Sequence, residues 1–172
     1  MQLIKWVSIL LLVIVGCAPI SGSRYNAFAV ANRLEKQWPG LTLANTEKPG
    51  NIYMADQYYF VPKVEEAKTL IRQGLPRKWY VDASVFGRSQ VIEYPVAPMT
   101  KDKNDCDKLS ARTKTYVQDA YDGEYPLAFG IVDVSGHSMN ILVCEELILL
   151  YDAQSDIIRS PNDTDKPYFM RF

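Results

Sequence analysis

Three side chains in the second half of the chain have the types and the order of a thiol-based hydrolytic site. Cys106 stands where a helix is expected to begin, His137 at the start of an expected strand, and Asp152 just past the end of the next one. A thiol at a helix N-terminus lies at the positive end of the helix dipole, which favours the thiolate. An imidazole can take the thiol proton, and a carboxylate behind the ring can orient it. His137 is the only histidine in the sequence, so any imidazole chemistry must involve it.

The spacing of the expected strands brings two of these residues together. A hairpin would join the strand at 138–144 to the strand at 147–151, with Glu145 and Glu146 in the turn. Counting outward from the centre of that turn sets residue 139 opposite Asp152. In this register Asp152 lies within two positions of His137 on the neighbouring strand, and neighbouring strands are about 4.8 Å apart.

Other interpretations of Cys106 stay open at this point. A single cysteine in a domain often acts as a small buried hydrophobic side chain. The carboxylates of Asp105 and Asp107 would raise the thiol pKa unless a cation or the histidine compensates for them. In an oxidising compartment Cys106 and Cys144 could instead form a disulfide. Since Cys144 lies roughly 23 Å along an extended strand from His137, Cys106 cannot both bridge Cys144 and touch His137 unless that strand bends sharply.

The elements that must position these residues predict an α+β domain in which the helix carrying Cys106 packs against an antiparallel sheet. The periodicity of apolar residues and the helix-end signals predict helices over Tyr25–Trp38, Pro62–Arg72 and Asp105–Tyr121. Runs rich in β-branched and aromatic residues predict extended segments at Ile52–Val61, Trp79–Val81, Gln90–Tyr94, Leu127–Val134, Ser138–Cys144, Leu147–Tyr151 and Pro167–Phe172.

The amino-terminal segment has the pattern of a secretory signal. A basic start is followed by an apolar run from Trp6 to Val15 and then by Gly16-Cys17. About ten apolar residues form a helix of roughly 15 Å, half the thickness of the hydrocarbon core, which is too short to span it. A charged start, a short apolar run and a small residue before the cleavage point are typical of a signal peptide.

The end of this segment, Ile14-Val-Gly-Cys17, resembles the lipobox of bacterial lipoproteins. The resemblance implies that residues 1–16 are removed, that Cys17 is acylated, and that the protein is attached to the membrane through that lipid. Ala18, rather than an aspartate, follows the cysteine, which by the same resemblance favours the outer membrane, facing the periplasm. We expect residues 17–50 to form a tether with a possible helix, beginning with the small and polar stretch Ala18–Ser23, and residues 51–172 to form the domain.

The order cysteine, histidine, acid resembles that of the papain-like fold. More closely, residues 58–156 resemble the papain-like C-terminal domain of Marasmius-type fungal agglutinins and related bacterial proteins. The matching pieces are Tyr59-Phe-Val-Pro62, Asp105-Cys-Asp107, Gly136-His-Ser-Met-Asn140 and Tyr151-Asp-Ala-Gln-Ser-Asp156.

This resemblance implies a role for each site residue. Cys106 would be the nucleophile, His137 the base, Asp152 the orienting acid and Gln154 a polar support. The family usually has a glutamate where Asp152 stands, so the third role departs from the pattern. No cofactor is expected from the residues themselves, but the agglutinin domain depends on calcium, which would make Asp105 and Asp107 conceivable ligands.

Composition narrows the class of function. A net charge of −1 provides no excess of basic residues for a phosphate backbone, so nucleic-acid binding is not expected. Two hypotheses follow. In one, the protein is a lipid-anchored thiol hydrolase that cleaves an amide bond in a peptide or in peptidoglycan; in the other, a non-catalytic domain of the same fold binds a protein or a glycan. Trp79 and Tyr80 are a conceivable carbohydrate platform, although aromatic residues in strands usually belong to the core.

Overall fold

The computed structural model describes residues 20–45, 47–74, 79–81, 90–92 and 105–172, and the structural statements below concern these residues. The helices are α2 (Ala27–Gln37), α3 (Val64–Gly74) and α4 (Asp105–Ala120). The strands are β1 (Gly22–Asn26), β2 (Ile52–Tyr53), β3 (Tyr58–Pro62), β4 (Trp79–Val81), β5 (Gln90–Ile92), β6 (Phe129–Val134), β7 (His137–Val143), β8 (Ile148–Asp152), β9 (Ile157–Arg159) and β10 (Pro167–Arg171).

A six-stranded sheet forms the centre of the fold, in the order β2-β10-β6-β7-β8-β9. All neighbouring pairs are antiparallel except β2 and β10, which run parallel. Two further pairs, β1 with β3 and β4 with β5, form separate two-stranded sheets. The prediction of an α+β domain, with the helix carrying Cys106 packed on an antiparallel sheet, is therefore confirmed.

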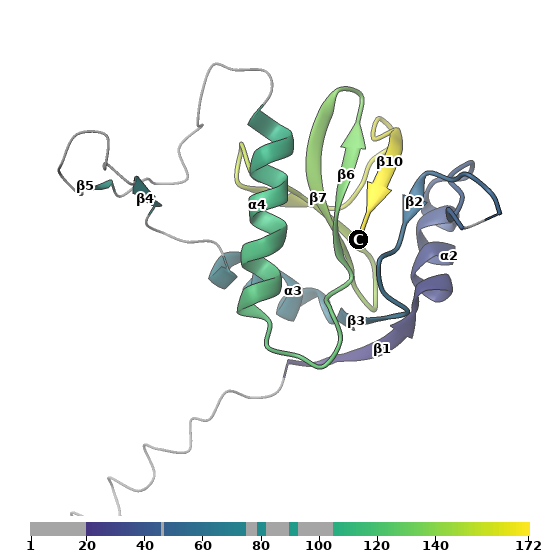
Figure 1. Ribbon diagram of the computed structural model, residues 1–172, viewed down its shortest axis with the longest axis horizontal. Helices are drawn as coiled ribbons and strands as arrows, with labels where there is room; N and C mark the ends of the chain where they lie inside the picture. The colour runs from purple at the N-terminus through teal and green to yellow at the C-terminus, as the bar shows by residue number, and fades with distance from the viewer. Residues whose placement is uncertain (1–19, 46, 75–78, 82–89, 93–104) are drawn as a thin grey trace, which may run out of the picture.

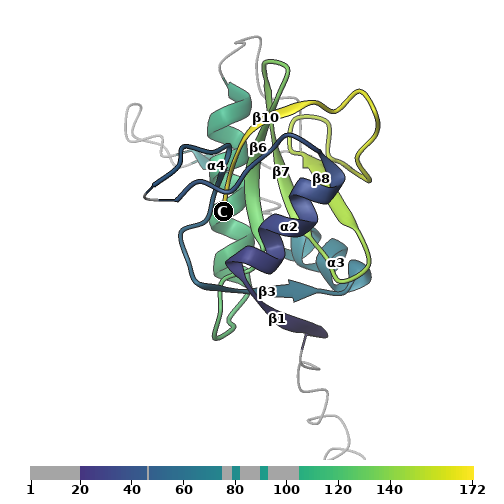
Figure 2. The same cartoon turned by 90° about the vertical axis from the view of Figure 1, so that its right-hand side faces the viewer.

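The helices cover opposite faces of the central sheet (Figure 1). On one face α2 packs through Val30, Ala31 and Leu34 against a first core of sheet residues. On the other face α3 and α4 contribute to a second core around Leu142 and Tyr151. Each large apolar side chain buried in this way stabilises the fold by about 1.5–3 kcal/mol. Figure 2 shows α2 in front of β7 and β8 with α4 behind them.

Polar side chains form hydrogen bonds at the start of α2 and near the end of α4. The side chain of Asn26 accepts a hydrogen bond of 2.8 Å from Ala29 N–H, so α2 begins with an asparagine cap. Near the end of α4 the Gln118 amide makes two 3.0 Å hydrogen bonds to the backbone of Leu127. These bonds connect the carboxyl end of α4 to the segment that enters β6, so the amino end of α4 lies toward the start of β7.

The structure moves several predicted boundaries. Tyr25, expected as the first apolar position of a helix, lies in β1 opposite Tyr59. Pro62, expected to open a helix, is the last residue of β3. The extended segment expected over 52–61 is divided between β2 and β3, which belong to different sheets, and β9 was not expected at all.

Several predictions concern residues 1–19, which lie outside the described residues. These are the signal peptide, the acylation of Cys17 and the first residues of the tether expected over 17–50. The part of that segment that the structure describes forms β1 and α2, and α2 packs into the first core. The strand expected to reach Tyr94 ends, as far as the structure describes it, at Ile92. Each helix in the described parts of the chain is too short or too polar to cross a bilayer.

Candidate active site

Cys106 is the second residue of α4, and it is a half-buried free thiol. One helical turn further along α4, Ser110 is buried on the side of the helix that packs against β7. Its hydroxyl donates to the Ser138 carbonyl at 2.9 Å, and its own carbonyl accepts from Asn140 Nδ2 at 2.8 Å. Residues four apart lie on the same face of a helix. The start of α4, with Cys106, is therefore held along the first residues of β7.

His137 and Asp152 lie side by side at the open end of the β7–β8 hairpin. Asn140 pairs with Tyr151, and this register continues to residue 139 opposite Asp152, as the sequence predicted. His137 Nε2 lies 3.3 Å from Asp152 Oδ1. The sequence-based prediction that these two residues are neighbours is confirmed.

Two further hydrogen bonds fix the carboxylate of Asp152. Oδ1 accepts from Gln154 N–H at 2.9 Å, and Oδ2 accepts from the Ser155 hydroxyl at 2.8 Å. Burial works against ionisation of Asp152, but these hydrogen bonds and the neighbouring His137 outweigh it and lower the pKa of the carboxyl group. Asp152 is therefore a carboxylate at neutral pH, able to orient the imidazole. Gln154 contributes its backbone N–H here; a role for its side chain stays a prediction.

The alternation of side chains along β7 indicates the face of the sheet to which each residue belongs. Asn140 and Leu142 point toward the face that carries α4, whereas Met139 and Ile141 point toward α2. By the same alternation His137, the first residue of the strand, belongs to the α2 face, together with Asp152. Within the described residues, no hydrogen bond joins the Cys106 thiol to His137. The structure thus brings together the histidine and the acid, and it places the thiol at the same end of β7 on the neighbouring helix.

Cys144 lies at the opposite end of β7, fully buried in the second core. Burial raises the pKa of its thiol to about 12, so it stays protonated and unreactive at neutral pH. Both Cys106 and Cys144 are free thiols, so the disulfide between them is not formed.

The conceivable calcium ligands, Asp105 and Asp107, lie at the start of α4. No group of three or more acidic, cysteine or histidine side chains gathers in the part of the chain that the structure describes. Asp107 is exposed at the start of α4, and the side chain of Asp105 lies outside the described atoms. Calcium is normally bound by six to eight oxygen ligands, and a role for Asp105 and Asp107 among them stays a prediction.

Comparisons with known proteins reveal a shared fold. No family model matches the chain, and no curated protein matches it by sequence. Two solved structures do match with a TM-score of 0.53 and 16% identity: a PSL1a–E64 complex, and the Polyporus squamosus lectin bound to the human-type influenza-binding epitope Neu5Acα2-6Galβ1-4GlcNAc. The alignments cover 87% of this chain, but 51% and 49% of the two neighbours, so the chain spans about half their length. The fold is thus similar to part of a fungal lectin.

Proposed function

We propose that the domain is a thiol hydrolase that cleaves an amide bond, with Cys106 as nucleophile, His137 as base and Asp152 as the residue that orients the imidazole. The observation that carries the proposal is the 3.3 Å contact between His137 and Asp152, which the hairpin register fixes. A carboxylate held by two further hydrogen bonds is a firm support for a catalytic imidazole. The position of Cys106 at the amino end of α4 supports its role, because the helix dipole there favours a thiolate.

The chemistry requires the thiol and the imidazole to meet. His137 takes the proton of Cys106, and the thiolate attacks the amide carbonyl to form a tetrahedral intermediate. That intermediate expels the amine, which leaves with the proton from His137. Water, deprotonated by His137, then releases the acid from the thioester. The imidazole must lie within about 4 Å of the sulfur for the first step.

Alkylation by E64, a thiol-reactive epoxide, tests this proposal, and the E64 complex of one structural neighbour supports the choice of reagent. We expect Cys106 to react rapidly near neutral pH. His137→Ala should slow the reaction by about a hundredfold or more, because a general base contributes about 10²–10⁴ in rate. Mass spectrometry of peptides should find the adduct on Cys106 and none on the buried Cys144.

Cys106→Ser is the blank for this experiment, and Asp152→Asn should give an intermediate rate. Iodoacetamide, which needs no recognition of its peptide-like part, separates thiol reactivity from binding of E64. Equal and slow alkylation of the wild type and His137→Ala by both reagents would exclude the hydrolase.

A second candidate is a non-catalytic domain that binds a glycan or a protein. The fold comparison favours this candidate over the hydrolase, because one neighbour is by its title a lectin bound to a glycan epitope. It predicts that Cys106→Ser leaves the biological activity unchanged. Loss of that activity in a folded Cys106→Ser protein would favour the hydrolase instead.

We also propose that acylation of Cys17 anchors the domain to the bacterial envelope, in the outer membrane and facing the periplasm. Cells grown with labelled palmitate should incorporate it into the wild-type protein and not into Cys17→Ala. The variant should then appear in the soluble periplasmic fraction, since buried acyl methylenes contribute about 0.8 kcal/mol each to membrane binding. Ser23→Ala, also near the amino terminus, is the matched control and should stay in the membrane. Membrane retention of an unlabelled Cys17→Ala would contradict the anchor.

A further inference from the structure

A cavity of about 530 Å³ lies between the end of α2 and the loop that leads into β10. Its walls come from two segments far apart in the sequence, residues 37–41 and 162–168, together with Asn51. The volume is within the range of small-molecule sites in proteins, about 300–1,000 Å³. The cavity does not include Cys106, His137 or Asp152, so it is a separate site from the proposed thiol centre.

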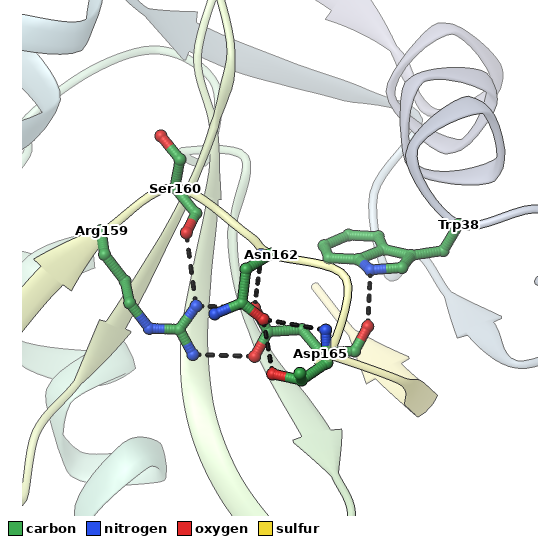
Figure 3. A network of polar contacts seen from close by, with 6 residues as sticks. Trp38, Arg159, Ser160, Asn162 and Asp165 are labelled. Carbon is green, nitrogen blue, oxygen red and sulfur yellow. Dashed lines mark hydrogen bonds and ion pairs between the residues drawn. The ribbon is translucent and has the colours of Figure 1, made fainter.

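Two aromatic side chains line the cavity. Trp38 donates its indole N–H to the Asp165 carbonyl at 3.0 Å, which fixes the plane of the ring (Figure 3). Tyr168, on the same wall, has 55% of its surface exposed and so is accessible to a ligand. An aromatic face suits a ligand with one apolar C–H surface, and the phenol and indole groups make such rings effective at wet binding sites.

The polar groups of the wall offer one donor and one acceptor that the protein does not use. The side-chain oxygen of Asn162, Oδ1, accepts hydrogen bonds from Thr164 N–H at 3.0 Å and from the Thr164 hydroxyl. The side-chain NH₂ group of Asn162 is not used in these bonds. The Asn51 NH₂ group donates to the Tyr168 carbonyl at 3.1 Å, which leaves its side-chain oxygen. Neither the Asn162 NH₂ nor the Asn51 side-chain oxygen has a hydrogen-bond partner among the described residues. A hydroxyl group both donates and accepts, so ligand hydroxyls are suited to groups of both kinds.

The charges around the cavity cancel. The buried carboxylate of Asp165 forms a two-point ion pair with Arg159, at 2.6 and 2.7 Å. The remaining charged side chains in the wall, Asp163 and Lys166, have opposite signs. A site without net charge offers no electrostatic advantage to a phosphate or a carboxylate, so the ligand that fits is uncharged.

The loop is held in place without a ligand. Asp165 accepts from Asn162 N–H at 2.7 Å, and its own N–H donates to the Asn162 carbonyl at 3.0 Å. Figure 3 shows Asp165 between the guanidinium of Arg159 and the indole of Trp38. A site that is ordered before binding does not lose conformational entropy when the ligand arrives.

We propose that this cavity binds a neutral pyranose sugar, with its C–H face on Trp38 or Tyr168 and two of its hydroxyls on Asn162 and Asn51. An apolar face, adjacent hydroxyls and no charge are together the properties of such a sugar. The inference rests on the second candidate function, glycan binding, and it does not depend on the reactivity of Cys106.

The test titrates the methyl glycosides of glucose, galactose, mannose and N-acetylglucosamine into ¹⁵N-labelled protein, with the indole N–H signal of Trp38 as readout. We expect saturable, millimolar binding of at least one glycoside, and a loss of about tenfold or more in affinity for Tyr168→Ala and Asn162→Ala. Both side chains are exposed, so these variants should fold even where Trp38→Ala does not. Tyr53→Ala removes an exposed aromatic residue outside the cavity and should bind as the wild type does.

A soluble oligomer of β-1,4-linked N-acetylglucosamine distinguishes the source of the sugar. Tighter binding of the oligomer than of the monomer supports a polymeric glycan, and equal binding supports a single sugar residue. Absence of saturable binding of any neutral sugar, unchanged binding in Tyr168→Ala and Asn162→Ala, or preference for glucuronate or glucose 6-phosphate would overturn the proposal. Cys106→Ser should bind the sugar normally, and Tyr168→Ala should be alkylated normally, so failure of one proposal is separable from failure of the other.

Discussion

Replacement of Asp165 by asparagine is expected to lower the free energy of unfolding by about 3 kcal/mol at neutral pH. The carboxylate is 6% exposed and accepts hydrogen bonds from both terminal nitrogens of Arg159 and from Asn162 N–H. The amide of the variant keeps the size of the side chain but removes the charge that balances Arg159. Hydrogen bonds to charged groups contribute about 1.5–3 kcal/mol each. Because Arg159 is partly exposed to water, we expect the summed loss to be close to the upper value for a single bond. Urea denaturation followed by circular dichroism measures the change.

The same variant should show a defined pH dependence. The hydrogen bonds from Arg159 lower the pKa of Asp165 in the folded state. A lowered pKa means that the stabilisation is fully present above the unfolded pKa of about 3.9 and disappears as the pH falls through the folded value. The stability difference between the wild type and Asp165→Asn should therefore be constant from pH 6 to 8 and shrink below about pH 4. Asp163→Asn, an exposed change in the same loop, is the control and should have little effect. A difference that is absent at neutral pH, or that persists unchanged in acid, would contradict this account.

Asn140→Ala is expected to destabilise the fold by about 2–4 kcal/mol. Asn140 is fully buried, and its NH₂ group donates to the Ser110 carbonyl on α4 and to the Gly130 carbonyl on β6, at 2.8 and 3.2 Å. The NH₂ group points at these two carbonyls, and the Asn140 oxygen is left without a partner among the described residues. Alanine would remove both of these hydrogen bonds and would open a cavity between α4 and the sheet.

Hydrogen exchange can locate the damage in Asn140→Ala. Faster exchange should appear in the first turns of α4, which carry Cys106, before it appears in β7 and β8. Asn45→Ala, in an exposed turn far from α4 in the sequence, serves as the matched control and should leave exchange in α4 unchanged. A loss of less than about 0.5 kcal/mol in Asn140→Ala would show that the contact between α4 and β7 does not depend on this side chain.

Local signals in the sequence were sufficient for the part of the site that a single hairpin forms. The turn at Glu145 and Glu146 and the alternation of the flanking strands determine the register, and the register alone brings Asp152 to His137. The start of α4 at Asp105 was also predictable, since its apolar positions recur with helical spacing. Neither signal tells on which side of β7 the helix packs, so the distance between Cys106 and His137 was beyond reach.

Long-range partners account for the boundaries that the sequence did not reveal. Tyr25 has an apolar side chain at helical spacing, but its backbone pairs with Tyr59 in β1, and the helix begins only after the Asn26 cap. At the start of α3, Val64 N–H donates to Glu146 Oε2 in the β7–β8 turn at 3.1 Å. This partner is far from Val64 in the sequence, so no local pattern indicates it.

Trp38 is the clearest case among the side chains. The sequence pattern places Trp38 at the end of a predicted helix. Its indole N–H donates to a backbone carbonyl in the loop before β10, and no local pattern indicates this long-range hydrogen bond. Trp79 and Tyr80 were a conceivable carbohydrate platform, although aromatic residues in strands usually belong to the core; their side chains lie outside the described part of the structure.

The place of β10 in the sheet has a consequence for the time course of folding. Strands β6 to β9 follow one another along the chain through short connections, so they can pair early in folding, before β2 and β10 join the sheet. Strand β10 sits between β6 and β2, and its pairing of Met170 with Ile52 closes a loop that contains most of the domain. Closing so long a loop is entropically costly and comes late. Until it happens, one side of β6 has no neighbour, and the nascent sheet presents an unpaired edge to other chains.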